Sequence, residues 1–233
     1  MKNLAIIPAR SGSKGLKDKN IKIFNGKPLI WYSVQAALQS EMFDEVMVST
    51  DSEKYGEIAL KCGANVPFLR SQKTASDTSS SWDSVREVVE NYRNRGRTFD
   101  NIMLLQPTSP LRHSGDIINA FEIFEKNNAD SVVSVCEVEH SPLWCNVLPE
   151  DGSLDNFFRS ELNEMRRRQD LPVFYRMNGA IYLIKVVNCP NIELSLYNKS
   201  SYAYRMPQIR SIDIDNELDF YMAEYIMKNK IQD

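Results

Sequence analysis

The sequence predicts an α/β fold in which a mostly parallel sheet is flanked by helices. Short, uninterrupted apolar runs alternate with amphipathic stretches of helical period, a pattern typical of parallel strands joined by crossover helices. The chain has 233 residues, of which 42% are hydrophobic and 25% charged, and these values fit one globular domain or one domain with a small subdomain. The apolar content is sufficient to offset the entropy of folding, which argues against disorder.

The first part of the chain contains the regular alternation of predicted strands and helices. The apolar runs that are short enough to be buried strands lie at residues 4–9, 45–49, 66–69, 101–105 and 131–138. The amphipathic stretches between them lie at residues 28–39, 53–62, 82–94 and 114–127. Local signals mark their ends: Pro28 occupies the first turn of one helix, Gly63 ends the next, and Ser114 caps the last of them.

The alternation stops at residues 139–175, which are rich in charge, proline and turn residues and show no clear period. We interpret this segment as an insertion or small subdomain within an α/β domain formed by residues 1–138 and 176–233. A strand is predicted again at residues 180–184, and a helix at residues 216–228. The apolar residues of that helix share one face, which we expect to be buried: Leu218, Tyr221, Met222, Tyr225 and Ile226.

Composition excludes several classes of protein. The net charge of −3 argues against a protein that coats nucleic acid. No apolar run approaches the roughly 18 residues of a membrane span, and the opening residues lack the apolar core of a signal peptide. The cysteines are scattered and form no CxxC pair for zinc: Cys62, Cys136, Cys145 and Cys189. We therefore expect buried, reduced thiols in a cytoplasmic protein without membrane contact.

The loop after the first predicted strand has the composition of a phosphate site. Ligands of open α/β sheets bind beyond the carboxyl ends of the strands. Glycines let the backbone approach a ligand, and basic side chains add positive charge. The candidate ligand-binding residues are Arg10, Ser11, Gly12, Ser13, Lys14, Gly15, Lys19 and Asn20. The glycine spacing matches neither a Walker A loop nor GxGxxG, which disfavours a P-loop NTPase or a dinucleotide dehydrogenase. A solvated turn is the alternative.

Two further segments carry polar side chains suited to a site. Gln106, Thr108 and Ser109 follow the strand at residues 101–105 and offer neutral hydrogen bonds, which suit hydroxyls better than phosphates. Arg112 follows them, and three interpretations of it are open: it caps a helix, it binds a carboxylate, or it forms half of a surface ion pair. Asp51 is expected to cap a helix.

Asp213 and Asp215 are the candidate metal ligands. They alternate along a segment predicted to be extended, so their carboxylates share one face. Mg²⁺ binds one or two carboxylates together with phosphate oxygens and water. The alternative is a pair of capping acids before Asn216, but a cap needs only one acid.

Five segments, in order, resemble the acylneuraminate cytidylyltransferase family, and the resemblance covers nearly the whole chain. They are residues 7–15 with Lys19-Asn20, Ser49-Thr50-Asp51, residues 106–112, residues 176–182 and residues 211–215. The resemblance implies a nucleotide-diphospho-sugar transferase fold. It also implies a Mg²⁺-dependent reaction of CTP with a nonulosonic acid, a nine-carbon α-keto acid sugar, giving the CMP-sugar and pyrophosphate.

The resemblance also implies residue roles. Residues 10–20 would hold the triphosphate and part of the cytosine, with Arg10 and Lys14 stabilising charge during transfer, while Arg70 and Ser81 would lie by the base and ribose. The residues assigned to the acceptor sugar are Gln106, Thr108, Ser109, Arg168, Asn178 and Tyr182. Residues 139–175 correspond to an exchanged arm, which predicts a homodimer. Trp144 stands where close relatives often carry a lysine that reaches the partner's site. The resemblance therefore does not predict whether this chain makes such a contact.

Other functions remain open at this point. The chain could be a nucleotidyltransferase for another base or sugar, or a binding module without turnover, although the paired Asp213 and Asp215 argue against the latter. The three arginines at residues 166–168 would suit a nucleic-acid-binding protein. The net negative charge of the chain argues against that function. The residues identify no general base, and they do not distinguish N-acetylneuraminic, legionaminic and pseudaminic acids as acceptors.

Overall fold

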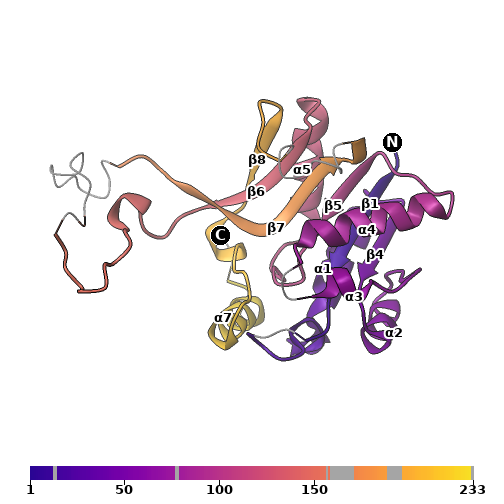
Figure 1. Ribbon diagram of the computed structural model, residues 1–233, viewed down its shortest axis with the longest axis horizontal. Coiled ribbons are helices and arrows are strands. Elements are labelled where there is room, and N and C mark those ends of the chain that lie inside the picture. The colour runs from indigo at the N-terminus through magenta and orange to yellow at the C-terminus, as the bar shows by residue number, and fades with distance from the viewer. Residues whose placement is uncertain (13–14, 77–78, 156, 158–170, 188–195, 232–233) are drawn as a thin grey trace.

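The centre of the fold is a six-stranded sheet with strand order β4-β1-β5-β7-β6-β8 (Figure 1). The computed structural model describes residues 1–12, 15–76, 79–155, 157, 171–187 and 196–231. The strands of the sheet are β1 (Asn3–Pro8), β4 (Glu45–Ser49), β5 (Asn101–Leu104), β6 (Ser131–Glu137), β7 (Tyr175–Lys185) and β8 (Ser201–Arg205). Strand β7 runs antiparallel to β5 and β6, whereas the pairs β1/β4, β1/β5 and β6/β8 are parallel. The predicted fold class is confirmed.

Helices cover both faces of this sheet. Helices α1 (Leu29–Ser40), α2 (Glu53–Lys61) and α5 (Ser114–Lys126) pack on one face, and α4 (Ser81–Asn94) packs on the other. The short helix α3 (Gln72–Ala75) precedes α4, and α7 (Glu217–Lys228) packs in a separate cluster with Phe24, Leu29 and Leu111. In β1, Ala5 and Ile7 belong to the hydrophobic cluster shared with α1, α2 and α5, while Leu4 and Ile6 belong to the cluster shared with α4. A strand that is buried on both faces is apolar at every position, which explains the uninterrupted run that the sequence shows.

Short elements complete the fold around the ends of the sheet. The strands β2 (Ile23–Phe24) and β3 (Lys27–Pro28) form a small hairpin before α1. Single 3₁₀ turns are η1 (Lys19–Ile21), η2 (Pro142–Trp144) and η6 (Gln208–Arg210).

Side-chain caps fix where the helices begin. The Ser52 hydroxyl caps α2, and reciprocal capping boxes start α4, through Ser80 and Asp83, and α7, through Asn216 and Asp219. The prediction that Ser114 caps α5 is wrong by one residue, because the N-cap is His113.

The strand predicted at residues 66–69 is absent from the structure. Asn65 makes an isolated bridge to Met47 of β4, and the ladder does not continue because Pro67 has no N–H to donate. The chain instead continues to Arg70, whose N–H donates to the Thr50 carbonyl at 2.8 Å.

The face of α7 that was predicted to be buried is largely exposed. The exposed side chains are Leu218, Tyr221, Met222 and Tyr225. The helix packs instead through Phe220 and Ala223, which are 2% and 0% exposed. The prediction failed because α7 is apolar around most of its circumference, so two different stripes have helical spacing.

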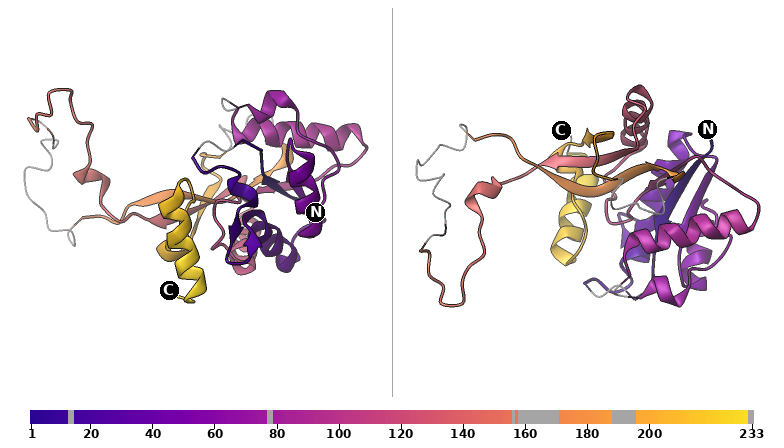
Figure 2. Two further views of the ribbon diagram at one scale, coloured as in Figure 1. Left: turned by 90° about the horizontal axis from the view of Figure 1, so that it is seen from below. Right: turned by 45° about the horizontal axis from the view of Figure 1, so that its top comes forward.

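The described parts of residues 139–175 extend away from the sheet, beyond the end of the β6/β7 pair (Figures 1 and 2). The pairing continues to the N–H of Val138, which donates to the Phe174 carbonyl at 3.1 Å. Strand β7 therefore begins at Tyr175, earlier than the sequence predicts. Residues 166–168 lie outside the described part of the chain.

Two predictions from composition can be compared with the structure. None of the described helices combines the length and apolar character needed to cross a membrane. Cys62 and Cys136 are buried as expected, whereas Cys145 is exposed, and Cys189 lies outside the described residues.

Candidate active site

A cleft of about 490 Å³ opens where β1 and β5 end. Its lining residues are Pro8, Arg10, Gly15, Lys19, Asn20, Arg70, Ser79, Ser81, Gln106, Pro107, Thr108, Asp213 and Asp215. They come from the loop after β1, the segments before α3 and α4, the turn after β5 and the segment before α7. Most of the residues predicted for nucleotide and metal binding therefore meet in one place. Ser13 and Lys14 lie outside the described residues.

Asp51 holds the start of the loop after β1. The backbone N–H of Ser11 donates to Asp51 Oδ1 at 2.7 Å, and the Ser11 hydroxyl donates to Oδ2 at 2.6 Å. Burial alone would raise the pKa of Asp51, but these two hydrogen bonds lower it below its usual value. The expectation that Asp51 caps α2 is wrong, since Ser52 does so. Asp51 is instead a positioning residue for the loop.

The far end of the same loop is also anchored. The Tyr55 hydroxyl of α2 donates to Asp18 Oδ1 at 2.9 Å, and Asn20 Nδ2 donates to the Arg10 carbonyl at 3.2 Å. The first contact fixes the loop to α2, and the second joins the two ends of the loop to each other. Both Arg10 and Asn20 also line the cleft.

The two loop glycines serve different purposes. Gly12 has a φ of +76°, a conformation that side chains disfavour. At Gly15, a Cβ would lie 2.5 Å from the Asp215 carbonyl oxygen, so the absence of a side chain lets the loop pack against the segment before α7. The contact that requires Gly15 is therefore within the protein.

Lys19 links the loop after β1 to the segment before α7 that carries Asp213 and Asp215. Its Nζ donates to the Ile214 carbonyl at 2.5 Å and lies 3.3 Å from Asp215 Oδ1. The lysine side chain is 13% exposed and the aspartate side chain 78%, so Asp215 keeps access to solvent and to a ligand.

Asp213 is a partly buried carboxylate whose Oδ1 atom is fully buried. Its Oδ1 has no hydrogen-bond partner among the described residues. Burial raises the pKa of Asp213 above its usual value, and the nearby Asp215 adds to the rise, against a hydrogen bond from Thr108 that lowers it. A cation would compensate this buried charge, so the pair of carboxylates fits a divalent metal ion bound together with phosphate oxygens.

Gln106 and Thr108 form the wall opposite the basic loop. The Thr108 hydroxyl donates to Gln106 Oε1 at 3.4 Å, and the Thr108 carbonyl accepts from the Ile214 N–H at 2.8 Å. Gly179 of β7 lies against this wall with a φ of +76°. A Cβ there would be 2.9 Å from Gln106 Oε1 and 3.3 Å from Asp213 Oδ2. A glycine at this position therefore leaves the room that both functional side chains occupy.

Of three further residues predicted for the acceptor sugar, two lie behind the cleft lining. Ser109 is fully buried, and its hydroxyl has no partner among the described residues. Asn178 is 1% exposed, and its amide is bonded to Ser134 and Ser211 at 2.6 and 2.9 Å.

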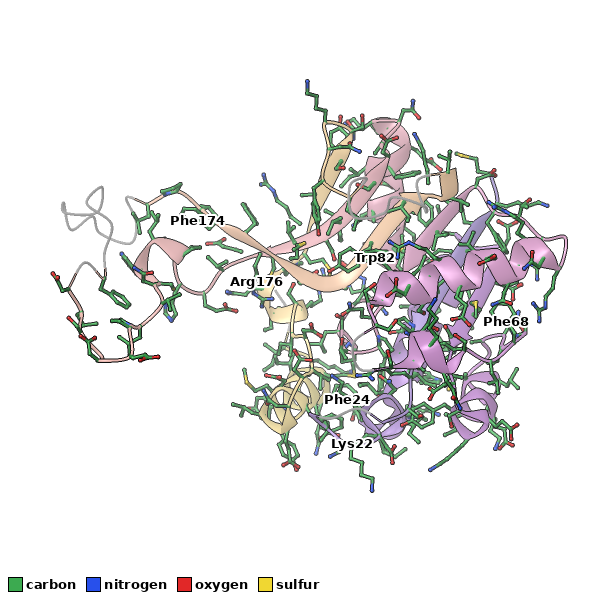
Figure 3. The ribbon with its side chains drawn as sticks, in the orientation of Figure 1. Lys22, Phe24, Phe68, Trp82, Phe174 and Arg176 are labelled. Carbon is green, nitrogen blue, oxygen red and sulfur yellow. The ribbon has the colours of Figure 1, made fainter. Side chains whose placement is uncertain are left out.

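Tyr182, the third of these residues, lies on β7 beside the start of α4. Its ring packs edge-on against Trp82, with centroids 5.4 Å apart. Figure 3 labels Trp82 at the end of α4 that lies beside β7. Burial raises the pKa of the Tyr182 hydroxyl, with smaller contributions from Tyr197 and Asp213. Arg168, also predicted for the acceptor, lies outside the described residues.

Arg112 is a buried side chain that links neighbouring segments through hydrogen bonds, rather than half of a surface ion pair. It is 2% exposed and donates to the Gln106 carbonyl at 3.2 Å, the Ala180 carbonyl at 3.0 Å and the Ser33 hydroxyl at 2.6 Å. Burial lowers its pKa to about 10. Arg112 thus joins the turn after β5 to β7 from beneath the cleft.

Sequence reasoning missed several residues that shape the site: Pro8, Asp51, Ser79, Pro107 and Gly179. A signal existed for Asp51, since it lies two residues beyond a buried strand at the ligand-binding edge of the sheet. The importance of Gly179 depends on a tertiary contact with Gln106, which no local pattern reveals.

Comparisons with known proteins are consistent with this geometry. A family model described as cytidylyltransferase matches residues 4–231. An N-acylneuraminate cytidylyltransferase of Streptococcus agalactiae is 39% identical over 222 residues, which are 94% of this chain and 52% of that protein. The chain therefore spans about half the length of this relative. A CMP-N,N'-diacetyllegionaminic acid synthase of Legionella pneumophila is 37% identical over 98% of this chain and 97% of its own length.

A solved structure supports the fold assignment. A CMP:2-keto-3-deoxy-manno-octonic acid synthetase, solved in complex with CTP, matches with a TM-score of 0.74 at 17% identity. The match covers 99% of this chain and 100% of that one.

Proposed function

Because the chain belongs to the cytidylyltransferase family, we propose that it transfers CMP from CTP to a nonulosonic acid and releases pyrophosphate. The observation that carries this proposal is the cleft, which sets Arg10, Lys19 and Arg70 beside Asp213 and Asp215 at one edge of the sheet. Basic side chains together with a metal-binding carboxylate pair suit a triphosphate. The similarity to an N-acylneuraminate cytidylyltransferase and a CMP-N,N'-diacetyllegionaminic acid synthase supports the acceptor class.

In the proposed reaction, the anomeric hydroxyl oxygen of the sugar attacks the α-phosphorus of CTP and gives up its proton to water. The bond from that phosphorus to the oxygen shared with the β-phosphate breaks, and pyrophosphate leaves. Such transfers depend on positioning and charge neutralisation, so they need no nucleophile from the protein. Arg10 and Lys14 stabilise the charge on the phosphate oxygens, and Arg70 and Ser81 hold the base and ribose.

Asp213 and Asp215 would hold Mg²⁺, which neutralises charge on the phosphate oxygens when it is bound. The buried Oδ1 of Asp213, which has no hydrogen-bond partner in the described part of the chain, supports this assignment. Lys19 maintains the position of this segment through the Ile214 carbonyl.

On the acceptor side, we assign direct contacts to Gln106, Thr108, Tyr182 and Arg168. Ser109 and Asn178 are assigned to the same site as supports, since both are buried behind its wall. The carboxylate of an α-keto acid needs a cation, and an arginine holds it through two hydrogen bonds. Arg168→Ala should therefore raise the KM for the sugar far more than the KM for CTP. The reverse pattern would move Arg168 to the phosphate side.

We also propose a homodimer formed through residues 139–175. The described part of this arm exposes apolar side chains: Trp144, Val147, Leu148, Leu154 and Val173. The described residues of the arm form no core in which to bury them, so a partner surface is expected to cover them. Sedimentation should find a dimer at micromolar concentration, and a fully active monomer would contradict this assignment.

The proposed substrate and product indicate a place in the cell. CTP is made in the cytoplasm, so we place the reaction there. The product is an activated sugar that a glycosyltransferase would consume during synthesis of a surface polysaccharide or glycan.

A pyrophosphate-release assay tests this function. The protein would be supplied with each of the four nucleoside triphosphates and with N-acetylneuraminic, legionaminic and pseudaminic acids. We expect release with CTP and at least one of these acids. Turnover that prefers another nucleotide would favour a different nucleotidyltransferase, and CTP binding without release would favour a non-catalytic homologue.

A further inference from the structure

Arg70 is a buried cation in an unfavourable setting. It lines the cleft and is only 9% exposed, and its Nε has no hydrogen-bond partner among the described residues. Burial lowers its pKa, and the neighbouring Arg10 acts in the same direction. A guanidinium in such a place keeps its charge and orientation only if nearby groups compensate it.

A hydrogen bond to a backbone carbonyl four residues further along the chain orients Arg70. Arg70 Nη2 donates to the carbonyl oxygen of Thr74, at the end of the short helix α3. A four-residue helix is too short to be stable alone, so the position of that carbonyl depends on what holds α3.

Glu87 of α4 holds α3. Its Oε1 accepts from the Ser71 N–H at 2.7 Å, and its Oε2 accepts from the Ser71 hydroxyl at 2.9 Å and from the Thr74 hydroxyl. One carboxylate therefore binds both ends of the turn that carries the Thr74 carbonyl. The charge of Glu87 also favours the charged form of Arg70, as does that of Asp51.

We propose that Glu87 is a positioning residue for nucleotide binding, acting through Arg70. Its hydrogen bonds to Ser71 and Thr74 fix the carbonyl that orients the guanidinium, and its charge compensates that of Arg70. Ser81, at the first turn of the same helix, lines the cleft as well. Helix α4 thus supports both residues assigned to the base and ribose. This inference rests on the proposed function, because it takes CTP as the ligand of Arg70.

The test compares CTP affinity in matched variants by calorimetry with Mg²⁺ present. Glu87→Gln removes the charge and one acceptor oxygen with little change of shape. Glu90→Gln is the control, since it removes the same charge at an exposed position three residues further along α4. We expect Glu87→Gln to raise the Kd for CTP about tenfold, equivalent to ~1.4 kcal/mol. The control should stay within about twofold of the parent protein, and the KM for the sugar should change little.

A double-mutant cycle separates positioning from a general loss of structure. In an Arg70→Ala background, Glu87→Gln should change the Kd for CTP by less than about twofold, because its effect passes through Arg70. If Arg70→Ala does not fold, Arg70→Lys takes its place. A tenfold effect of Glu87→Gln that persists in either background would overturn the inference, as would equal affinity of Glu87→Gln and the parent. A parent protein that binds no CTP would overturn the proposed function itself, and the inference with it.

Discussion

Gly179→Ala adds one methyl group at the centre of the proposed site. Gly179 has a φ of +76°, and a Cβ there would lie 2.9 Å from Gln106 Oε1 and 3.3 Å from Asp213 Oδ2. Both distances are shorter than ordinary van der Waals contacts. Gln106 Oε1 is the end of a flexible side chain, so we expect it to move away rather than unfold the domain. The substitution should therefore displace the groups assigned to the acceptor and the metal.

Gly96 provides a control for the backbone. It has a φ of +72°, and no atom lies within 4 Å of the position that a Cβ would occupy. Placing alanine in this conformation costs about 1–2 kcal/mol at either position. For a protein of this size, that cost corresponds to a fall in Tm of about 2–8 °C.

The two variants should differ in activity. We expect Gly179→Ala to lower kcat/KM in pyrophosphate release at least about tenfold, or ~1.4 kcal/mol of transition-state stabilisation. Gly96→Ala should stay within about twofold of the parent at a temperature where both variants are folded. Equal activity of the two variants would show that the space beside Gly179 does not matter for catalysis, and would refute the reasoning.

Three further predictions concern the candidate metal ligands and the loop that follows β1. Asp213→Asn or Asp215→Asn should lower turnover at least about tenfold, and excess EDTA should abolish it; undiminished release in EDTA would contradict the metal assignment. The lowered pKa of Asp51 means that its carboxylate stabilises the folded state above its usual pKa of 3.8, and that this stability is lost as pH falls through the lower folded value. Asp51→Asn should therefore reduce the free energy of unfolding by about 1 kcal/mol at pH 7, with the difference closing in acid, and a pH-independent difference in urea titrations would refute the role of its charge. Lys14→Ala should reduce activity while leaving Tm nearly unchanged, because it lies on a glycine-rich loop and its loss leaves no core cavity; a melt lowered like that of a core variant would contradict this.

The sheet could be predicted from sequence because its central strands are buried on both faces. Leu4, Ile6, Ala5 and Ile7 alternate between two hydrophobic clusters, so the whole run is apolar and stands out from its surroundings. Residues 66–69 are also apolar, but Pro67 prevents strand pairing there. Helix α7 was predicted with the wrong face buried, since two of its stripes are apolar.

The site could be predicted in part. Arg10, Lys19, Asp213 and Asp215 lie in short motifs at the ends of predicted elements, and the structure places all of them in one cleft. The supporting contacts could not be found this way. Asp51 meets Ser11 across 40 residues of sequence, and such contacts follow from the packing of the sheet rather than from any local pattern.

The most direct test of the central claim is the identity of the product. The protein would be incubated with CTP, Mg²⁺ and each nonulosonic acid, and the mixture analysed by mass spectrometry alongside pyrophosphate measurement. We expect equal amounts of pyrophosphate and a CMP-sugar ester with at least one of the acids. Turnover with sugar 1-phosphates alone, or CMP released without a sugar ester, would contradict the account.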